Sequence, residues 1–70
     1  MFVNIEAERG RAQMTKEALS AELGISQPTY NAYVRGDSAI PSTILVKLSE
    51  LFGVSTDYLL GRTDTRGGPA

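Results

Sequence analysis

The sequence lacks two residue types that carry much of the chemistry of protein sites: its 70 residues include no cysteine and no histidine. Disulfides, thiolate chemistry and structural zinc sites are therefore excluded. Imidazole, the most frequent general acid or base, is excluded as well. Since the remaining residues form no pattern of nucleophile, base and metal ligands, we expect a protein that is not an enzyme and has neither a cofactor nor a small-molecule substrate.

Long hydrophobic runs are also missing. No apolar run approaches the ~18 to 20 residues of a membrane span, and no signal sequence opens the chain. We therefore expect a cytoplasmic protein without a membrane partner. Hydrophobic residues make up 41% and charged residues 21%, which is typical of a folded domain rather than a disordered chain. A single domain of this length buries a small core, so dimerisation would help its stability.

Positive charge is not in excess. Seven Lys and Arg stand against eight Asp and Glu, which gives a net charge of −1. Proteins that bind nucleic acid by general attraction to phosphates are often distinctly basic. If this chain binds DNA, specific contacts and local phosphate anchors must therefore supply most of the binding energy.

The residues from 14 to 36 have the pattern of two short helices joined by a tight turn. Thr15 is placed to cap a first helix over residues 16–23, and Gly24 can take the left-handed conformation that ends it. Ser26 is placed to cap a second helix. The spacing therefore predicts a helix-turn-helix.

The second of these helices is predicted over residues 27–34, with Pro28 in the first turn, where its missing N–H costs little. Its inward positions are Tyr30, Tyr33 and Val34. Its outward positions carry neutral hydrogen-bonding and small apolar side chains, namely Gln27, Pro28, Thr29, Asn31 and Ala32. Such side chains suit contact with DNA base edges, although a solvated surface is the ordinary explanation for them in an arbitrary helix.

Three further helices are predicted around this pair: one over residues 2–12, one that follows a cap at Ser42 or Thr43 and ends at residue 52, and one over residues 56–60. The second of these three helices has the strongest periodicity. Its inward positions are Ile44, Leu45, Leu48, Leu51 and Phe52, and its outward positions are Lys47, Ser49 and Glu50. Ser55 is placed to cap the last helix. Residues 62–70 contain no apolar anchor, so we expect a flexible tail.

Several groups of residues together resemble a known family. They are residues 14–20 (MTKEALS), 23–26 (LGIS), 33–36 (YVRG) and 51–61 (LFGVSTDYLLG), with Pro41, Ser42 and Leu48 between the last two. At this spacing the chain is similar to the phage repressor and Cro-like (Xre-type) helix-turn-helix domains. The resemblance implies an all-α five-helix bundle over residues 1–61, binding operator DNA, commonly as a homodimer, with its third helix in the major groove.

The resemblance also implies roles for individual residues. Base-reading positions are held by Gln27, Pro28, Asn31 and Ala32. Phosphate-contacting positions are held by Lys16, Ser26, Thr29, Arg35, Ser38 and Ser42. Lys16 can also be a plain solvated lysine, and Arg35 is as well suited to stabilising its loop as to contacting a phosphate. The candidate dimer residues are Phe52, Tyr58 and Leu60, for which the ordinary alternative is the core.

The chain departs from the family at two positions. Arg9 stands where the family often has an arginine paired with a glutamate of the third helix, but Val34 replaces that glutamate. Arg9 must therefore find a carbonyl, another carboxylate or solvent. Tyr30 replaces an aliphatic core residue, so either its hydroxyl emerges toward the DNA or the local packing differs.

Two functions fit the sequence. The first is a sequence-specific DNA-binding transcriptional regulator that occupies a near-palindromic operator. The second is a protein-interaction module that keeps the fold and does not bind DNA, as the net charge and the missing partner of Arg9 suggest. Arg62 and Arg66 are either a basic arm for DNA or, as we expect, part of a disordered tail.

Overall fold

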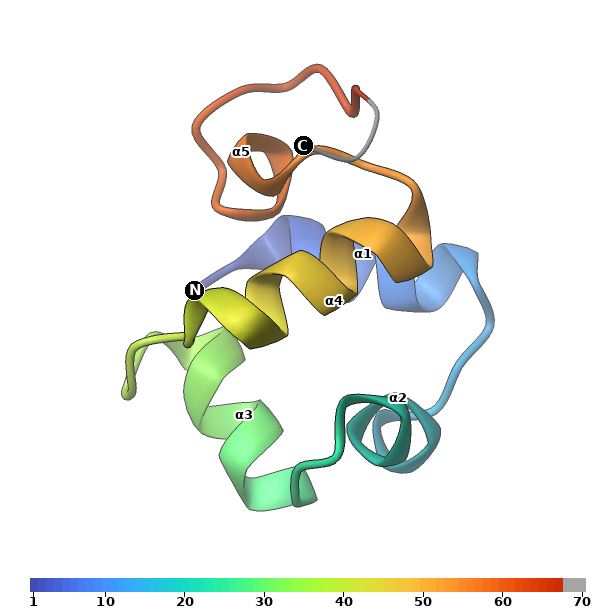
Figure 1. The fold of residues 1–70 in the computed structure, drawn as a ribbon, viewed down its shortest axis with the longest axis vertical. Coiled ribbons are helices and arrows are strands. Elements are labelled where there is room, and N and C mark those ends of the chain that lie inside the picture. The colour runs from blue at the N-terminus through green and yellow to red at the C-terminus, as the bar shows by residue number, and fades with distance from the viewer. Residues whose placement is uncertain (68–70) are drawn as a thin grey trace.

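Five short helices make up the part of the chain that the computed structural model describes, residues 1–67 (Figure 1). They are α1 (Val3–Arg11), α2 (Lys16–Leu23), α3 (Gln27–Arg35), α4 (Ser42–Phe52) and α5 (Thr56–Leu59). Within this described range no residue is in a strand. The predicted all-α, five-helix architecture is confirmed, and each helix begins and ends within about a residue of its predicted limits.

Side-chain caps begin three of the helices, as the sequence indicated. The hydroxyl oxygens of Thr15, Ser26 and Ser55 accept hydrogen bonds from the backbone N–H groups of Ala18, Thr29 and Tyr58 at 3.0, 3.3 and 3.1 Å. These bonds satisfy N–H groups that have no partner within the helix. The turn between α2 and α3 then depends on Gly24, whose φ of 71° ends α2 in the left-handed conformation.

The start of α4 differs from the prediction that Ser42 or Thr43 caps it. The N-cap position is held by Pro41, and no side chain there accepts a capping hydrogen bond. The Pro41 carbonyl instead accepts the N–H groups of Ile44 and Leu45 at 3.1 and 3.0 Å. Pro41 has an extended backbone with φ −60° and ψ 146°, and Ser42 is the first residue of the helix instead of its cap.

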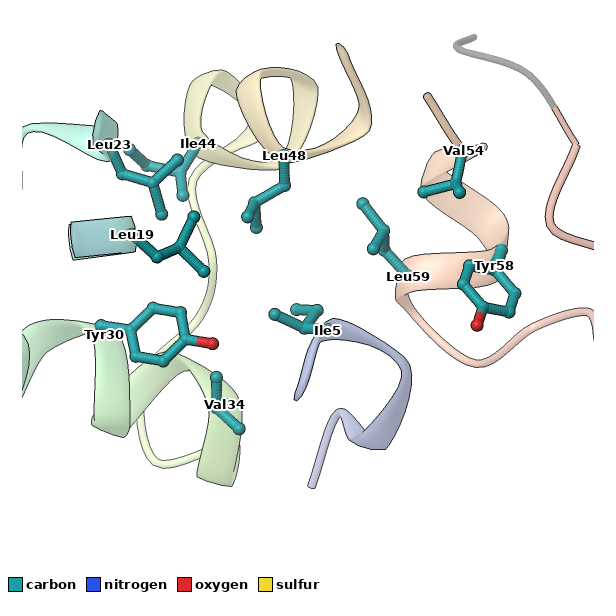
Figure 2. Packing of buried hydrophobic residues seen from close by; sticks show 10 residues of the cluster. All are labelled: Ile5, Leu19, Leu23, Tyr30, Val34, Ile44, Leu48, Val54, Tyr58 and Leu59. Atoms are coloured by element: carbon teal, nitrogen blue, oxygen red, sulfur yellow. The ribbon is translucent and has the colours of Figure 1, made fainter. Parts of the chain in front are cut away.

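Buried hydrophobic side chains from all five helices meet in one cluster (Figure 2). The cluster contains Ile5, Leu19, Leu23, Tyr30, Val34, Ile44, Leu48, Val54, Tyr58 and Leu59. In Figure 2, Tyr30 and Tyr58 enter from opposite ends, with Ile5 of α1 between them. The core therefore joins the helix pair α2 and α3 at one end of the molecule to α5 at the other (Figure 1).

Two positions of α4 differ from the predicted pattern of burial. Ser49, predicted to face outward, is buried and donates from its hydroxyl to the Val54 carbonyl at 2.6 Å. Leu51, predicted to face the core, is 44% exposed. The reason is that α4 packs against both α2 and α5. The covered side of the helix is set by these neighbours, and periodicity alone does not show where they lie.

The segment after α5 folds back over the domain (Figure 1). The backbone N–H of Ser55 donates to the Arg66 carbonyl at 2.7 Å. The Arg66 guanidinium donates from Nε and Nη2 to Glu8 of α1, at 3.1 and 2.8 Å. The sequence predicted no anchor in this segment because residues 62–70 contain no large apolar side chain, and the anchor that forms is polar. Residues 68–70 of the expected tail lie outside the described residues, and the flexibility of the tail stays a prediction.

Candidate nucleic-acid interface

The helix pair α2 and α3 lies at the end of the molecule opposite α5 (Figure 1). Tyr30 and Val34 fix the other side of α3 in the core, where they are 1% and 6% exposed. The C-terminal end of α3 is tied to the start of the chain, since the Phe2 N–H donates to the Val34 carbonyl at 2.7 Å. The rotation of α3 about its own axis is therefore fixed by buried contacts.

The four predicted base-reading residues lie on the side of α3 that this packing leaves accessible. Gln27 and Pro28 are exposed at the first turn of the helix, and Asn31 and Ala32 follow one turn later with partial exposure. The structure thus brings the four together on one helical surface. Two amide side chains and two small apolar groups on one surface are suited to hydrogen-bond donors, acceptors and methyl groups in a DNA major groove.

Ser26 and Thr29, both predicted phosphate contacts, are bonded to each other. The Ser26 hydroxyl accepts from the Thr29 backbone N–H and donates to the Thr29 hydroxyl oxygen at 2.9 Å. Because a hydroxyl has one hydrogen to donate, Ser26 has none left for a phosphate oxygen. The Thr29 hydroxyl hydrogen remains free to donate. In this geometry Thr29 is the better phosphate donor, and Ser26 acts as the helix cap.

Three other predicted phosphate contacts are exposed on separate elements. Lys16 is the first residue of α2, Ser38 lies in the loop after α3, and Ser42 is the first residue of α4. No side chain caps α4, so the N–H groups of Ser42 and Thr43 at its start are available to an anion. The starts of α2 and α4 therefore combine a polar side chain with the positive end of a helix dipole.

Arg35, the remaining predicted phosphate contact, has a partner already. Its Nε donates to an Asp37 carboxylate oxygen at 2.9 Å, and both side chains are largely exposed. The structure thus shows the loop contact that the sequence analysis left open as one role of Arg35. A phosphate must compete with Asp37 for this guanidinium, although an exposed ion pair of this kind is weak.

Arg9 and Tyr30 meet at a carboxylate behind α3. Arg9 donates from Nε and Nη2 to Glu6 at 3.1 and 2.9 Å, and from Nη1 to the Met14 carbonyl at 2.8 Å. The Tyr30 hydroxyl also donates to Glu6. Arg9 therefore has both a carboxylate and a carbonyl partner, which the sequence analysis named as alternatives. The Tyr30 hydroxyl points into the domain and not toward the outer surface of α3.

The hydrogen bonds at Glu6 shift two pKa values in opposite directions. The Arg9 hydrogen bonds are the largest cause of a lowered pKa for Glu6, because they favour the carboxylate form. Burial is the largest cause of a raised pKa for Tyr30, and its hydrogen bond to Glu6 adds to it. Glu6 is thus held as an anion that accepts from a neutral tyrosine and a charged arginine.

The candidate dimer residues differ in how much surface they offer. Tyr58 is only 7% exposed and belongs to the core, so it can contribute little to an interface. Phe52 and Leu60 are partly exposed at the ends of α4 and α5. Leu51 adds apolar surface beside Phe52, which the sequence analysis missed because it assigned Leu51 to the core.

Two further findings concern the described residues. None of the helices in residues 1–67 has both the length and the apolar composition of a membrane span. Within the same residues, no three acidic, histidine or cysteine side chains are grouped so as to hold a metal ion.

Comparison with known proteins identifies the family. The sequence model described as helix-turn-helix matches residues 5–59. Two relatives from Bacillus subtilis (strain 168) carry the names uncharacterized HTH-type transcriptional regulator YobD and YqaE. The chain is 38% identical to YobD over 52 residues, which is 74% of this chain and 46% of the relative. It is 33% identical to YqaE over 57 residues, which is 81% of this chain and 49% of the relative.

The chain therefore spans about half the length of the curated relatives it matches. No solved structure matches it. The family match covers α2, α3 and the turn between them, together with most of the supporting helices. The chain belongs to the Xre/Cro-like family of helix-turn-helix proteins.

Proposed function

We propose that this protein is a sequence-specific DNA-binding transcriptional regulator that places α3 in the major groove of its operator. The observation that carries the proposal is the accessible polar surface of α3 next to its buried residues. Tyr30 and Val34 are buried, while Gln27 and Pro28 are exposed and Asn31 and Ala32 are partly exposed. The names of the two relatives, both HTH-type transcriptional regulators, support it.

Recognition would rest on two kinds of contact at α3. The side-chain amides of Gln27 and Asn31 can each donate to N7 and accept from N6 of an adenine. Pro28 and Ala32 offer apolar surface to thymine methyl groups. Since Gln27 and Asn31 are four residues apart, they lie one above the other along the helix and can read neighbouring base pairs.

Phosphate contacts would fix the position of the domain on the duplex. Lys16, Thr29, Ser38 and Ser42 carry this role in the proposal, with Arg35 joining if a phosphate displaces Asp37. The net charge of −1 means that general attraction to DNA is weak. Sequence-specific contacts must then provide most of the affinity.

We further propose that two copies bind a near-palindromic operator whose half-sites lie about one helical turn apart, as two-fold symmetry requires. Phe52 and Leu60 remain the proposed dimer residues, and Leu51 extends the apolar surface at the end of α4. A regulator of this kind acts in the cytoplasm, where it blocks polymerase or recruits it.

The test is selection of bound duplexes from a random pool at low salt, followed by affinity measurements on the selected sequence. We expect a two-fold symmetric sequence. Gln27→Ala should cost about 1 to 3 kcal/mol and relax the preference at one base pair. Lys16→Ala should weaken all sequences alike and reduce the slope of log affinity against log salt by about one. Equal behaviour of the two variants would contradict the division into base-reading and phosphate-contacting residues.

The second candidate function is a protein-interaction module that does not bind DNA. The pairing of Arg35 with Asp37 favours it, because it reduces the positive charge beside α3. The same selection decides between the two. If no sequence is enriched and binding shows no dependence on salt, the DNA-binding proposal fails and the interaction module stands.

A further inference from the structure

The hydrogen bonds around Glu6 join α1, the connection between α1 and α2, and α3. Glu6 and Arg9 lie on α1, the Met14 carbonyl lies in the connection to α2, and Tyr30 lies on α3. Arg9 donates both to Glu6 and to Met14, while Tyr30 donates to Glu6. We call Glu6, Arg9, Tyr30 and the Met14 carbonyl the Glu6 network.

This network lies next to both halves of the proposed DNA-binding surface. Met14 is two residues before Lys16, the proposed phosphate contact at the start of α2. The charge of Lys16 is close enough to help lower the pKa of Glu6. On α3, Tyr30 is flanked by Gln27, one turn before it, and by Asn31, the next residue. The network thus connects the start of α2, which would contact DNA phosphates, to α3, which would contact the bases.

The hydroxyl of Tyr30 is not needed to fill the core. A phenylalanine ring has nearly the same volume, and apolar side chains suffice at the neighbouring buried position Val34. What the hydroxyl adds is a directional bond to a carboxylate whose other bonds come from Arg9. Hydrogen bonds to charged groups are stronger and more demanding in geometry than contacts between apolar groups. The bond therefore restricts how α3 is turned and shifted against α1.

We propose that Tyr30 is a positioning residue for DNA recognition, which holds the base-reading surface of α3 in register with the start of α2 through Glu6, Arg9 and the Met14 carbonyl. This inference rests on the proposed DNA-binding function. It assigns to a buried side chain, with no surface available to DNA, part of the control of sequence discrimination.

The chain offers a matched control for the test. Tyr58 is also a buried tyrosine whose hydroxyl donates to a carboxylate of α1, here Glu8, at 3.2 Å. It enters from α5, at the end of the molecule opposite α2 and α3 (Figures 1 and 2). Tyr30→Phe and Tyr58→Phe therefore remove the same chemical group and the same kind of bond, at two distances from the proposed DNA surface.

The experiment measures, for each variant, the ratio of affinities for the selected operator and for a duplex of scrambled sequence, together with the salt slope. We expect Tyr30→Phe to reduce the ratio by about three- to tenfold, in keeping with the net contribution of one typical hydrogen bond. The salt slope should stay unchanged, because no phosphate contact is removed. Tyr58→Phe should leave the ratio unchanged.

A second measurement needs no DNA. Amide hydrogen exchange in Tyr30→Phe should accelerate at residues 13–16 and along α3, whereas Tyr58→Phe should accelerate it in α5. An unchanged ratio in Tyr30→Phe, or an equal loss in both variants, would overturn the inference while leaving the proposed function in place. Failure of the unsubstituted chain to select any sequence would overturn the proposed function itself. Unchanged exchange at residues 13–16 and in α3 would show that the Glu6 network does not hold these elements.

Discussion

Two carboxylates on α1 serve different parts of the molecule. Glu6 and Glu8 are two residues apart, so they leave the helix on different sides. Glu8 is 2% exposed and accepts hydrogen bonds from Arg66, Tyr58 and Arg11. Glu6 has a side chain that is 27% exposed and accepts from Arg9 and Tyr30. One residue faces α5 and the returning C-terminal segment, and the other faces α3.

The difference in burial separates the roles of the two sites. A carboxylate that is shut off from water depends on all its partners, because any one that is lost leaves charge uncompensated. Glu8 therefore holds the end of the chain and α5 to α1. Glu6 keeps contact with water, which can replace part of a lost bond. Its network contributes less to stability, and its main effect is on the geometry of the elements around it.

The largest effect on stability is expected from Glu8→Gln, since it removes a buried negative charge that accepts hydrogen bonds from three side chains. Unfolding free energy should fall by about 1 to 3 kcal/mol, because the amide cannot accept the bidentate Arg66 contact and buries an NH₂ group without a matching acceptor. Urea unfolding followed by circular dichroism measures it. Discrimination between operator and scrambled DNA should not change. Glu6→Gln is the matched control, and a larger loss of stability there would reverse the assignment of roles.

Acid should unfold the protein mainly through these two carboxylates. Hydrogen bonds from Arg66 are the largest cause of the lowered pKa of Glu8, and those from Arg9 are the largest cause at Glu6. The unfolded chain, with glutamate near pKa 4.5, therefore takes up protons before the folded one. Stability should be full above about pH 4.5 and should fall as the pH drops below it.

Unfolding free energies measured across this range, for the parent chain and for Glu8→Gln, check this expectation. The variant should show a flatter dependence on pH than the parent, because it lacks the more deeply buried of the two carboxylates. Identical slopes would mean that the pKa of Glu8 is the same in the folded and unfolded chains, so that its arginine contacts do not persist in solution.

The stability of the protein at alkaline pH should depend on the Glu6 network, because Tyr30 belongs to it. The pKa of Tyr30 is raised from its usual 10.0, first by burial and then by its hydrogen bond to Glu6. Tyrosine in the unfolded chain loses its proton near pH 10 while folded Tyr30 keeps it, so stability falls as the pH rises above 10. One pH unit higher, the loss from this residue should be about 1 kcal/mol. Tyr30→Phe should remove that part of the decline in urea unfolding experiments, and an unaltered decline would contradict the raised pKa.

The smallest effect on stability is expected from Asp37→Asn, which breaks the exposed ion pair with Arg35. Unfolding free energy should change by less than about 0.5 kcal/mol, because water screens such a pair. This variant supplies the reference against which the two sites of α1 are compared. It also frees Arg35, so binding to scrambled DNA should become stronger at low salt. Unchanged binding would exclude Arg35 as a phosphate contact.

Local sequence signals predicted the caps of three helices and the outward-facing residues of α3. The caps at Thr15, Ser26 and Ser55 and the glycine at position 24 act within a few residues along the chain, and each is found as expected. The outward set on α3 followed from helical spacing alone. The motif around the turn was specific enough to indicate the family, which the family comparison confirmed.

The prediction was weaker wherever the neighbours of a residue decide its role. Leu51 and Ser49 exchanged their predicted environments because α2 and α5 together determine which side of α4 is covered. Ser26 was assigned to phosphate by its position in the motif. Its hydroxyl hydrogen, however, is used by Thr29.

The amino-acid sequence alone was enough to predict the five helices, three of their caps and the polar surface of α3, since these depend on periodicity and on caps within a few residues. The long-range partners of Glu6 and Glu8 depend instead on how the helices pack together. Tyr30 lies 24 residues from Glu6, and Tyr58 and Arg66 lie 50 and 58 residues from Glu8. No local pattern encodes such pairs, because they form only when packing of the apolar core brings α3, α5 and the C-terminal segment against one helix.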